Sequence, residues 1–288
     1  MNIGNPLREI NWVEKSNTLE VLLEHEGSFH AVSLDSGLEA EVMKIAAPTA
    51  DYVLKVWNKA SKPNVHAQYQ ILSALFTHGS SVSEPVGWGT NRNGDSTLLT
   101  SYDGMPVQTV DPGKLAKLVQ ILADIHKLPL EDFIGDRLPR YEFIDYFFPR
   151  IEEHPDIRIL LEELLQRADM KPSCLIHGDY HLGNILETKD KLTVIDWTNA
   201  QWGDPRYDVA WSIIIMWIFA SEEQADMYRA ACCAEYRYEE HDLELFEAIA
   251  CLRGIMLFKA NDEPIGHHII ARFRSILSKN EYLNDQLL

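Results

Sequence analysis

The stretch LIHGDYHLGNIL, residues 175–186, crowds two histidines, an aspartate and an asparagine between apolar flanks. We expect a short strand before this polar loop and a β-hairpin after it, because apolar runs bound the loop and a turn follows. The second strand of the hairpin is expected at 192–195, and Asp196 follows it directly. A hairpin brings the residue before its first strand, Asn184, close to the residue after its second. Asp179 lies in the loop just before them, so two carboxylates and one amide oxygen converge.

Hard oxygen ligands of this kind suit Mg²⁺, which binds few protein groups and completes its shell with water and phosphate oxygens. A further carboxylate beside such a metal can accept or orient a hydroxyl proton. Phosphoryl transfer to an alcohol needs this combination, because the protein mainly positions the groups and neutralises the phosphates.

Three motifs of this region resemble the signature of the aminoglycoside phosphotransferase family, which includes choline kinases and related small-molecule kinases. They are HGDYHLGN at 177–184, VIDW at 194–197 and GDPRYDVA at 203–210. The resemblance implies an α+β, protein-kinase-like fold in two lobes: a small antiparallel β-sheet lobe with one helix, and a larger, mostly helical lobe. It also implies a kinase that transfers the γ-phosphate of ATP or GTP to a hydroxyl of a small acceptor.

The same resemblance assigns roles within these motifs. Asp179 matches the catalytic-loop aspartate that orients and deprotonates the acceptor hydroxyl. Asn184 and Asp196 match the Mg²⁺ ligands. His177 takes the place of a structural histidine, and Asp208 matches the aspartate that braces the catalytic loop from the following helix.

Upstream residues extend the resemblance to nucleotide binding. In YVLKVW, Lys55 matches the strand lysine that pairs with nucleotide phosphates. Gly37 lies in the segment that would cover the phosphates. Ser101 and Tyr102 lie in the hinge whose backbone would bind adenine.

Two features depart from the kinase pattern. Gln68 stands where kinases have a helix glutamate that pairs with the strand lysine, so this position offers Lys55 a hydrogen-bond acceptor but no charge. The covering segment contains Gly37 alone, which is a weak phosphate-loop signal.

The periodicity of apolar residues changes along the chain, from short strand-like runs to helical spacing. We therefore predict an N-terminal nucleotide-binding lobe over 1–102 and a C-terminal catalytic and substrate-binding lobe over 103–288. Strands are expected over 28–34, 40–45, 51–57 and 96–102, and helices over 17–27, 64–76, 111–128, 158–168, 208–220, 222–236 and 243–258.

Composition limits the partners. The 288 residues carry a formal net charge of −18, which disfavours nucleic acid and anionic membranes and is compatible with a cationic small molecule. The four cysteines have no CxxC spacing, and the N-terminus has no apolar signal region, so we expect reduced thiols in a cytoplasmic protein. The longest apolar run, 210–220, is too short to span a bilayer.

Other interpretations remain open at this level. The H-x-D-x-H run formed by His177, Asp179 and His181 could belong to a metal-dependent hydrolase. Gln68 would also fit a catalytically weak pseudokinase or nucleotide-dependent binding module. The sequence leaves the oligomeric state and the acceptor open, although the helices after residue 210 are rich in acids that would suit a cationic acceptor.

Overall fold

The computed structural model describes residues 2–3, 5–25, 29–34, 40–61, 63–129, 135–189, 191–260 and 266–288. Contacts divide the chain into two compact units. The first comprises Met1–Pro106 and Ile185–Thr198, and the second comprises Val107–Asn184 and Asn199–Leu288. This division differs from the predicted boundary after residue 102, because 103–106 and the hairpin at 185–198 belong to the first unit.

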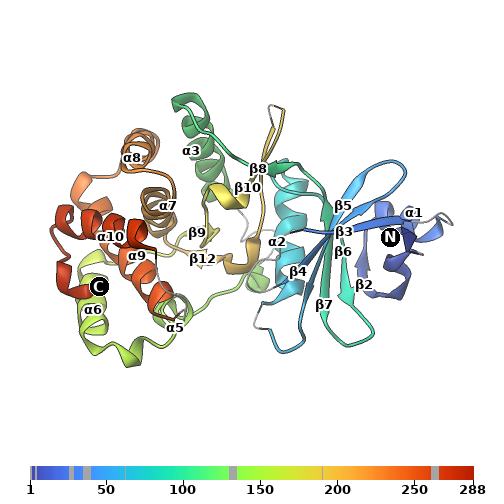
Figure 1. Cartoon of the computed structure of the whole chain (residues 1–288), viewed down its shortest axis with the longest axis horizontal. Coiled ribbons are helices and arrows are strands. Elements are labelled where there is room, and N and C mark those ends of the chain that lie inside the picture. Colours follow the sequence, from blue (N-terminus) through green and yellow to red (C-terminus); the bar gives the residue numbers. More distant parts are fainter. Residues whose placement is uncertain are drawn as a thin grey trace. The chain divides into compact units, whose positions relative to one another are not determined.

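A seven-stranded antiparallel sheet, in the order β1-β3-β4-β5-β7-β6-β2, forms the frame of the first unit (Figure 1). Its strands are β1 (Asn2–Ile3), β2 (Asn11–Lys15), β3 (Phe29–Ser33), β4 (Glu41–Ala46), β5 (Asp51–Trp57), β6 (Pro85–Thr90) and β7 (Ser96–Ser101). The helices of this unit are η1 (Pro6–Glu9), α1 (Asn17–Glu24) and α2 (Val65–Thr77), with η5 (Trp197–Asn199) at the passage to the second unit. Ser16 caps α1 and Asn64 caps α2, each by accepting a backbone N–H of the first turn.

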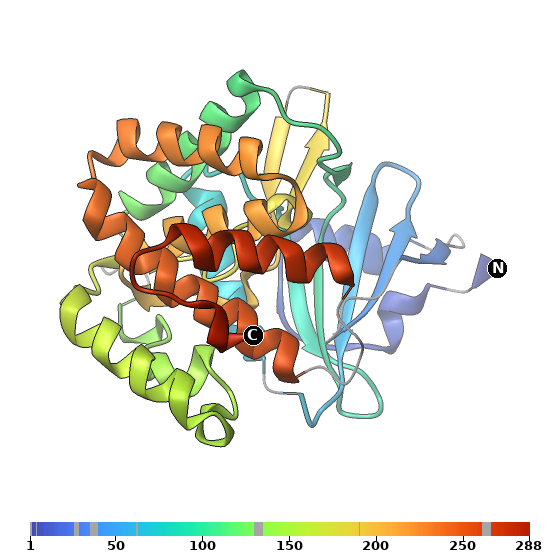
Figure 2. The ribbon, with the colours of Figure 1, turned by 60° about the vertical axis from the view of Figure 1, so that its left-hand side comes forward.

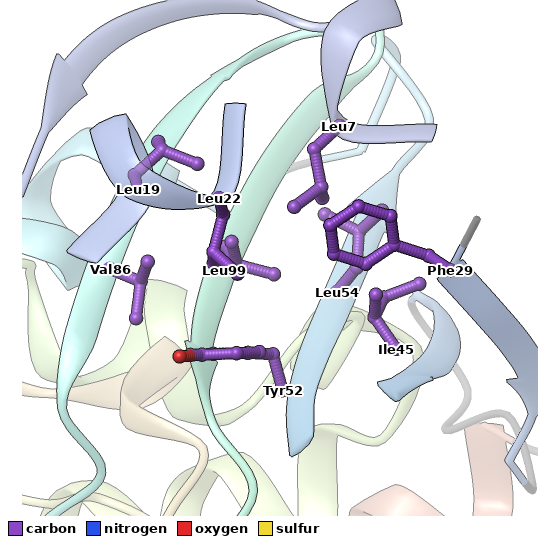
Figure 3. Close-up of a cluster of buried hydrophobic side chains, with 9 residues drawn as sticks. All are labelled: Leu7, Leu19, Leu22, Phe29, Ile45, Tyr52, Leu54, Val86 and Leu99. Carbon is purple, nitrogen blue, oxygen red and sulfur yellow. The ribbon is translucent and has the colours of Figure 1, made fainter. Parts of the chain in front are cut away.

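One face of this sheet carries an apolar core shared with η1 and α1 (Figure 3). Its buried members are Leu7, Leu19, Leu22, Phe29, Ile45, Tyr52, Leu54, Val86 and Leu99. Side chains alternate across a strand, so Tyr52 and Leu54 of β5 point into this core while Lys55 points to the opposite face. The core thereby fixes the strand that presents Lys55.

A smaller three-stranded sheet completes the first unit. It joins β8 (Met105–Pro106), β10 (Ile185–Thr188) and β11 (Lys191–Val194) in the order β11-β10-β8. The register pairs Ile185 with Val194, so the predicted hairpin begins directly after Asn184 and ends two residues before Asp196. The pairing of β10 with β8 explains why this hairpin groups with the first unit.

The second unit is mostly helical. Its helices are α3 (Pro112–His126), η2 (Gly135–Arg137), α5 (Phe143–Phe147), η3 (Ile151–Glu153), α6 (Pro155–Ala168), η4 (Leu182–Asn184), α7 (Pro205–Phe219), α8 (Glu222–Tyr236), α9 (Glu240–Ala260), α10 (His267–Lys279) and η6 (Asp285–Leu287). The strands β9 (Cys174–Ile176) and β12 (Gln201–Gly203) pair antiparallel.

Helix α7 is the centre of this unit. It is apolar on all sides and packs against α8, α9 and α10, which lie beside it in Figures 1 and 2. Cys174, Cys232 and Cys251 are buried free thiols, and Cys233 is a half-buried one. Within the ranges given above, no helix combines the length and the apolarity that a membrane crossing requires.

Candidate active site

A tight loop follows β9 and carries the HGD motif. Gly178 has φ +74°, and a Cβ atom there would lie 2.6 Å from the backbone oxygen of Asn199. Only glycine meets both conditions without strain. The loop therefore turns sharply just before Asp179, and the backbone N–H of Asp179 donates to Nδ1 of the buried His177 at 3.2 Å.

Asp208, in the first turn of α7, anchors this loop by accepting two of its backbone hydrogen bonds. Its Oδ2 accepts the backbone N–H of His177 at 2.7 Å, and its Oδ1 accepts that of Gly178 at 2.8 Å. Nε2 of His126 lies 3.1 Å from the same Oδ2. Complete burial would raise the pKa of Asp208, but the contacts with His126 and His177 outweigh it and lower the pKa below its usual range.

The carboxylate of Asp179 is held from several sides. Its Oδ1 accepts the indole N–H of Trp211, on α7, at 2.8 Å. Its Oδ2 lies 3.4 Å from Nδ2 of Asn184 and 3.5 Å from Nε2 of His181. Burial acts to raise the pKa of Asp179, yet the His181 contact, the charge of Arg253 and the Trp211 hydrogen bond together lower it.

Asn184 is suited to hold a metal ion through its side-chain oxygen. The residue is 8 % exposed, and its Nδ2 donates to the backbone oxygen of Asp179 at 2.9 Å. This hydrogen bond uses the amide nitrogen, so the side-chain oxygen Oδ1, a hard oxygen donor, is not needed to hold the loop. The described part of the chain contains no group of three or more His, Cys, Asp or Glu side chains arranged to bind a metal. The H-x-D-x-H run is therefore not arranged as a zinc site.

In the first unit, Lys55 and Asp196 form an ion pair at 3.5 Å. Asp196 has φ +65°, a left-handed conformation that aspartate tolerates better than most residues and that often marks a functional position. Thr198 donates its hydroxyl to Oδ1 of Asp196 at 2.7 Å. The Asp196 side chain is 39 % exposed, so the carboxylate remains open to a further cation.

Gln68 lies on α2 and is 3 % exposed. Its Nε2 is buried without a hydrogen-bond partner in the part of the chain that the structure describes. The carboxylate that pairs with Lys55 is Asp196, which supplies the charge that Gln68 lacks.

The predicted hinge residues lie at the end of β7, and Gly37 lies outside the described residues. The backbone N–H of Ser101 donates to Glu84, and that of Tyr102 donates to Asp51, each at 3.0 Å. An adenine ring at this segment would therefore have to use other backbone groups or displace these bonds.

Three residues that contact Asp179, Asp208 or the loop between β9 and Asp179 are not among the site residues predicted from the sequence. Trp211 and Arg253 lie within apolar helical runs, and His126 lies at the end of α3. Arg253 carried the clearest signal, because a charged residue inside a buried helix is rare unless it is paired or functional.

The acid-rich helices contain a cavity of about 220 Å³. Its lining comprises Ile214, Trp217, Asp226, Arg229, Glu240, Glu244, Glu247, Ile276, Lys279 and Asn280. Arg229 forms ion pairs with Glu240 at 3.4 Å and Glu247 at 2.7 Å, and Lys279 pairs with Glu222. Part of the acidic charge is thus neutralised within the chain.

Several solved structures of small-molecule kinases are similar to this chain. The chain is similar to a thermostable mutant of aminoglycoside phosphotransferase APH(4)-Ia in ternary complex with AMP-PNP and hygromycin B: 19% identity over 91% of this chain and 98% of that chain, with a TM-score of 0.65. It is similar to Plasmodium vivax ethanolamine kinase, with 14% identity over 86% and 82% of the two chains and a TM-score of 0.62. It is also similar to the choline kinase LicA from Streptococcus pneumoniae, with 15% identity over 91% and 95% and a TM-score of 0.62. A search of curated protein sequences finds no match.

These similarities show the predicted protein-kinase-like α+β fold. The model described as "Phosphotransferase enzyme family" matches residues 30–246, which is most of the chain and contains the HGD loop, the IDW motif and Lys55. The chain is therefore a member of the aminoglycoside phosphotransferase family of small-molecule kinases.

Proposed function

We propose that this enzyme transfers the γ-phosphoryl group of ATP to a hydroxyl group of a small acceptor, and that Asp179 orients that hydroxyl. The observation that carries the proposal is the Asp179 carboxylate, whose Oδ1 is fixed by Trp211 at 2.8 Å while Oδ2 has only longer contacts. An acceptor hydroxyl that donates to Oδ2 would be aimed by a carboxylate that is already held in place.

In this reaction, the acceptor oxygen forms a bond to the γ-phosphorus as the bond to the β–γ bridging oxygen breaks. The hydroxyl proton passes to Asp179 and then to solvent or the product phosphate. The lowered pKa of Asp179 makes it a weak base, which suits a loose transition state in which the proton leaves late. Orientation is then its larger contribution.

Asn184 and Asp196 would hold Mg²⁺ through oxygen atoms, and Lys55 would bind the phosphates. When bound, Mg²⁺ neutralises charge on the phosphate oxygens. The fit rests on the donors: an amide oxygen and a carboxylate that is 39 % exposed, both of the hard type that this ion prefers.

ATP is the preferred phosphate donor in this proposal, because similar structures contain AMP-PNP, and GTP is the alternative. The net charge of −18 favours a cationic acceptor such as an amino alcohol or an aminoglycoside.

The test is ADP or GDP release from Mg·ATP and Mg·GTP against aminoglycosides, choline, ethanolamine and sugars. Asp179→Asn should lower kcat by roughly 100- to 10,000-fold, the range for losing a general acid–base group, without weakening nucleotide binding. Asp124→Asn, on the exposed face of α3, is the matched control and should behave as wild type. Undiminished turnover by Asp179→Asn would overturn the assigned role.

Nε2 of Gln68, which is buried without a hydrogen-bond partner among the described residues, favours a second candidate, a nucleotide-dependent binding module of low activity. Tight nucleotide binding without release of diphosphate for any acceptor in the panel would support that alternative.

A further inference from the structure

We propose that Arg253 is a positioning residue for Asp179, acting through Trp211 and through the backbone of Gly178. The inference rests on the proposed role of Asp179 in orienting the acceptor. All four residues lie in the second unit, and none of the three motifs contains Arg253.

Arg253 contacts the catalytic loop directly. It lies on α9 and is 5 % exposed. One guanidinium nitrogen, Nη1, donates to the backbone oxygen of Gly178 at 2.7 Å and to the hydroxyl of Tyr207 at 3.1 Å. The Gly178 carbonyl belongs to the peptide bond that leads into Asp179, so this hydrogen bond fixes the backbone from which the Asp179 side chain departs.

A second route runs through Trp211. The guanidinium carbon of Arg253 lies 3.9 Å from the centre of the Trp211 ring, a cation–π distance. The same indole ring donates its N–H to Oδ1 of Asp179. Arg253 thus holds the ring whose edge determines where one carboxylate oxygen lies.

The surroundings of Arg253 are unusual for a residue that serves stability alone. Among the described residues, the guanidinium donates to a backbone oxygen and a tyrosine hydroxyl rather than to a carboxylate, and its buried Nε has no hydrogen-bond partner. Phe147 adds a second aromatic face at 4.4 Å. A buried guanidinium without a direct carboxylate partner is costly, even though its charge also acts on Asp179, and an apolar side chain of similar length would fill this aromatic site at less cost. A role in holding the Gly178 backbone and the Trp211 indole explains why a guanidinium occupies this site.

Arg253→Met keeps the length of the side chain and removes its charge and donors. We expect kcat for ADP release from Mg·ATP to fall by about 10- to 100-fold, since small misplacements of a catalytic group have effects of this size, while KM for ATP stays within about threefold. The assay uses the most active acceptor of the panel, or water when none is active. Arg253→Lys should recover part of kcat because it restores a donor toward Gly178.

Arg272→Met is the matched control. Arg272, on α10, donates to the backbone oxygens of Trp217 and Ile218 at the end of α7, and among the described residues these hydrogen bonds do not reach the HGD loop. This variant should change thermal stability more than kcat. An equal loss of kcat in Arg272→Met and Arg253→Met would overturn the inference, because it would reflect general loosening around α7.

A double-mutant cycle with Trp211→Phe tests the route. Phenylalanine keeps an aromatic ring beside Arg253 but has no N–H to donate to Asp179. If Arg253 acts through Trp211, the two substitutions together should lower kcat by clearly less than the product of their separate effects. The Trp211 indole N–H resonance, identified by its loss in Trp211→Phe, should shift in Arg253→Met and not in Arg272→Met.

Asp179→Asn separates the two levels of interpretation. If Asp179→Asn retains turnover, the proposed function itself fails. If Asp179→Asn is inactive while Arg253→Met has wild-type kcat and an unshifted Trp211 resonance, only the inference about Arg253 fails.

Discussion

The ammonium group of Lys55 lies 3.5 Å from Oδ1 of Asp196, and this contact joins the middle of β5 to the end of the β10–β11 hairpin. Both side chains retain exposure, 19 % for Lys55 and 39 % for Asp196. An exposed ion pair contributes little to folding, typically about 0–1 kcal/mol. Its position therefore has more meaning for the proposed nucleotide binding, in which a lysine and an aspartate that would hold Mg²⁺ have to lie near the same phosphates.

Lys55→Met should lower kcat/KM for ATP by roughly 100-fold, because it removes a fixed cation from the site of the phosphates. The unfolding free energy should change by about 1 kcal/mol or less, since the pair is partly exposed to solvent. Steady-state kinetics measures kcat/KM, and denaturant unfolding measures the free energy. Lys15→Met, on the exposed edge strand β2, should change neither quantity. A wild-type kcat/KM in Lys55→Met would show that Lys55 does not bind the phosphates.

Asp208→Asn should destabilise the second unit by about 3–5 kcal/mol, the usual cost of breaking a buried, hydrogen-bonded charge pair. Asparagine would turn an NH₂ group toward the N–H donors of His177 and Gly178, or toward His126. Denaturant unfolding measures the loss, and the exposed Asp124→Asn serves again as reference.

The same substitution has a predictable pH dependence. The pKa of Asp208 is lowered in the folded state, so its stabilising contribution is present above the unfolded value of 3.8 and is lost as the pH falls through the lower, folded value. The difference in stability between wild type and Asp208→Asn should therefore shrink in strong acid. A constant difference down to low pH would mean that the carboxylate contributes through its shape and not its charge.

The hairpin and the loop before it could be predicted from sequence because their signals are local. Apolar runs of strand length enclose a polar loop and a turn, and the observed pairing of Ile185 with Val194 follows from the turn between them. The buried helix α7 was predicted for a similar reason, since a run that is apolar on all sides has to be enclosed by protein.

Strand β6 is absent from the strands expected from the sequence, because glycines usually interrupt a strand pattern. Gly87 and Gly89 alternate along the strand, and a Cβ atom would lie 2.5 Å from Leu19 at the first position and 2.3 Å from the Asn11 oxygen at the second. These glycines permit the close approach of β2 and α1 and do not mark a turn. Spatial neighbours of this kind cannot be inferred from a single sequence.

Trp211 and Arg253 illustrate the same limit at the candidate site. The position of Trp211 indicates only burial, and the charge of Arg253 in a buried helix does not name its partner. The contacts with Asp179 and Gly178 depend on how α7 and α9 pack on the loop. Sequence motifs therefore identify candidate catalytic residues more readily than the residues that position their side chains.

Glu247 is a buried carboxyl group whose folded-state pKa is raised to about 7. Burial is the largest cause, and the charges of Glu244 on α9 and Asp226 on α8 add to it, while Arg229 opposes it. In the folded state Glu247 holds a proton at pH values where the unfolded chain, with a value near 4.5, has lost it. The stability that this protonation provides is complete below about pH 4.5 and is lost as the pH rises toward about 7.

Glu247→Gln should therefore remove a decline in unfolding free energy of up to about 3 kcal/mol between pH 5 and pH 8, at about 1.4 kcal/mol for each unit of pKa. Glutamine keeps a carbonyl oxygen for the hydrogen bond from Nε of Arg229, which is 2.7 Å long in the wild type, so the variant should match or exceed wild-type stability at pH 8. Urea unfolding at several pH values measures the slope, and Glu163→Gln, on the exposed face of α6, should retain the wild-type slope. If the decline persists in Glu247→Gln, a group other than Glu247 causes the pH dependence of the unfolding free energy. If the variant is less stable than wild type throughout, the ionised pair with Arg229 stabilises the packing of α8 on α9 in spite of its burial.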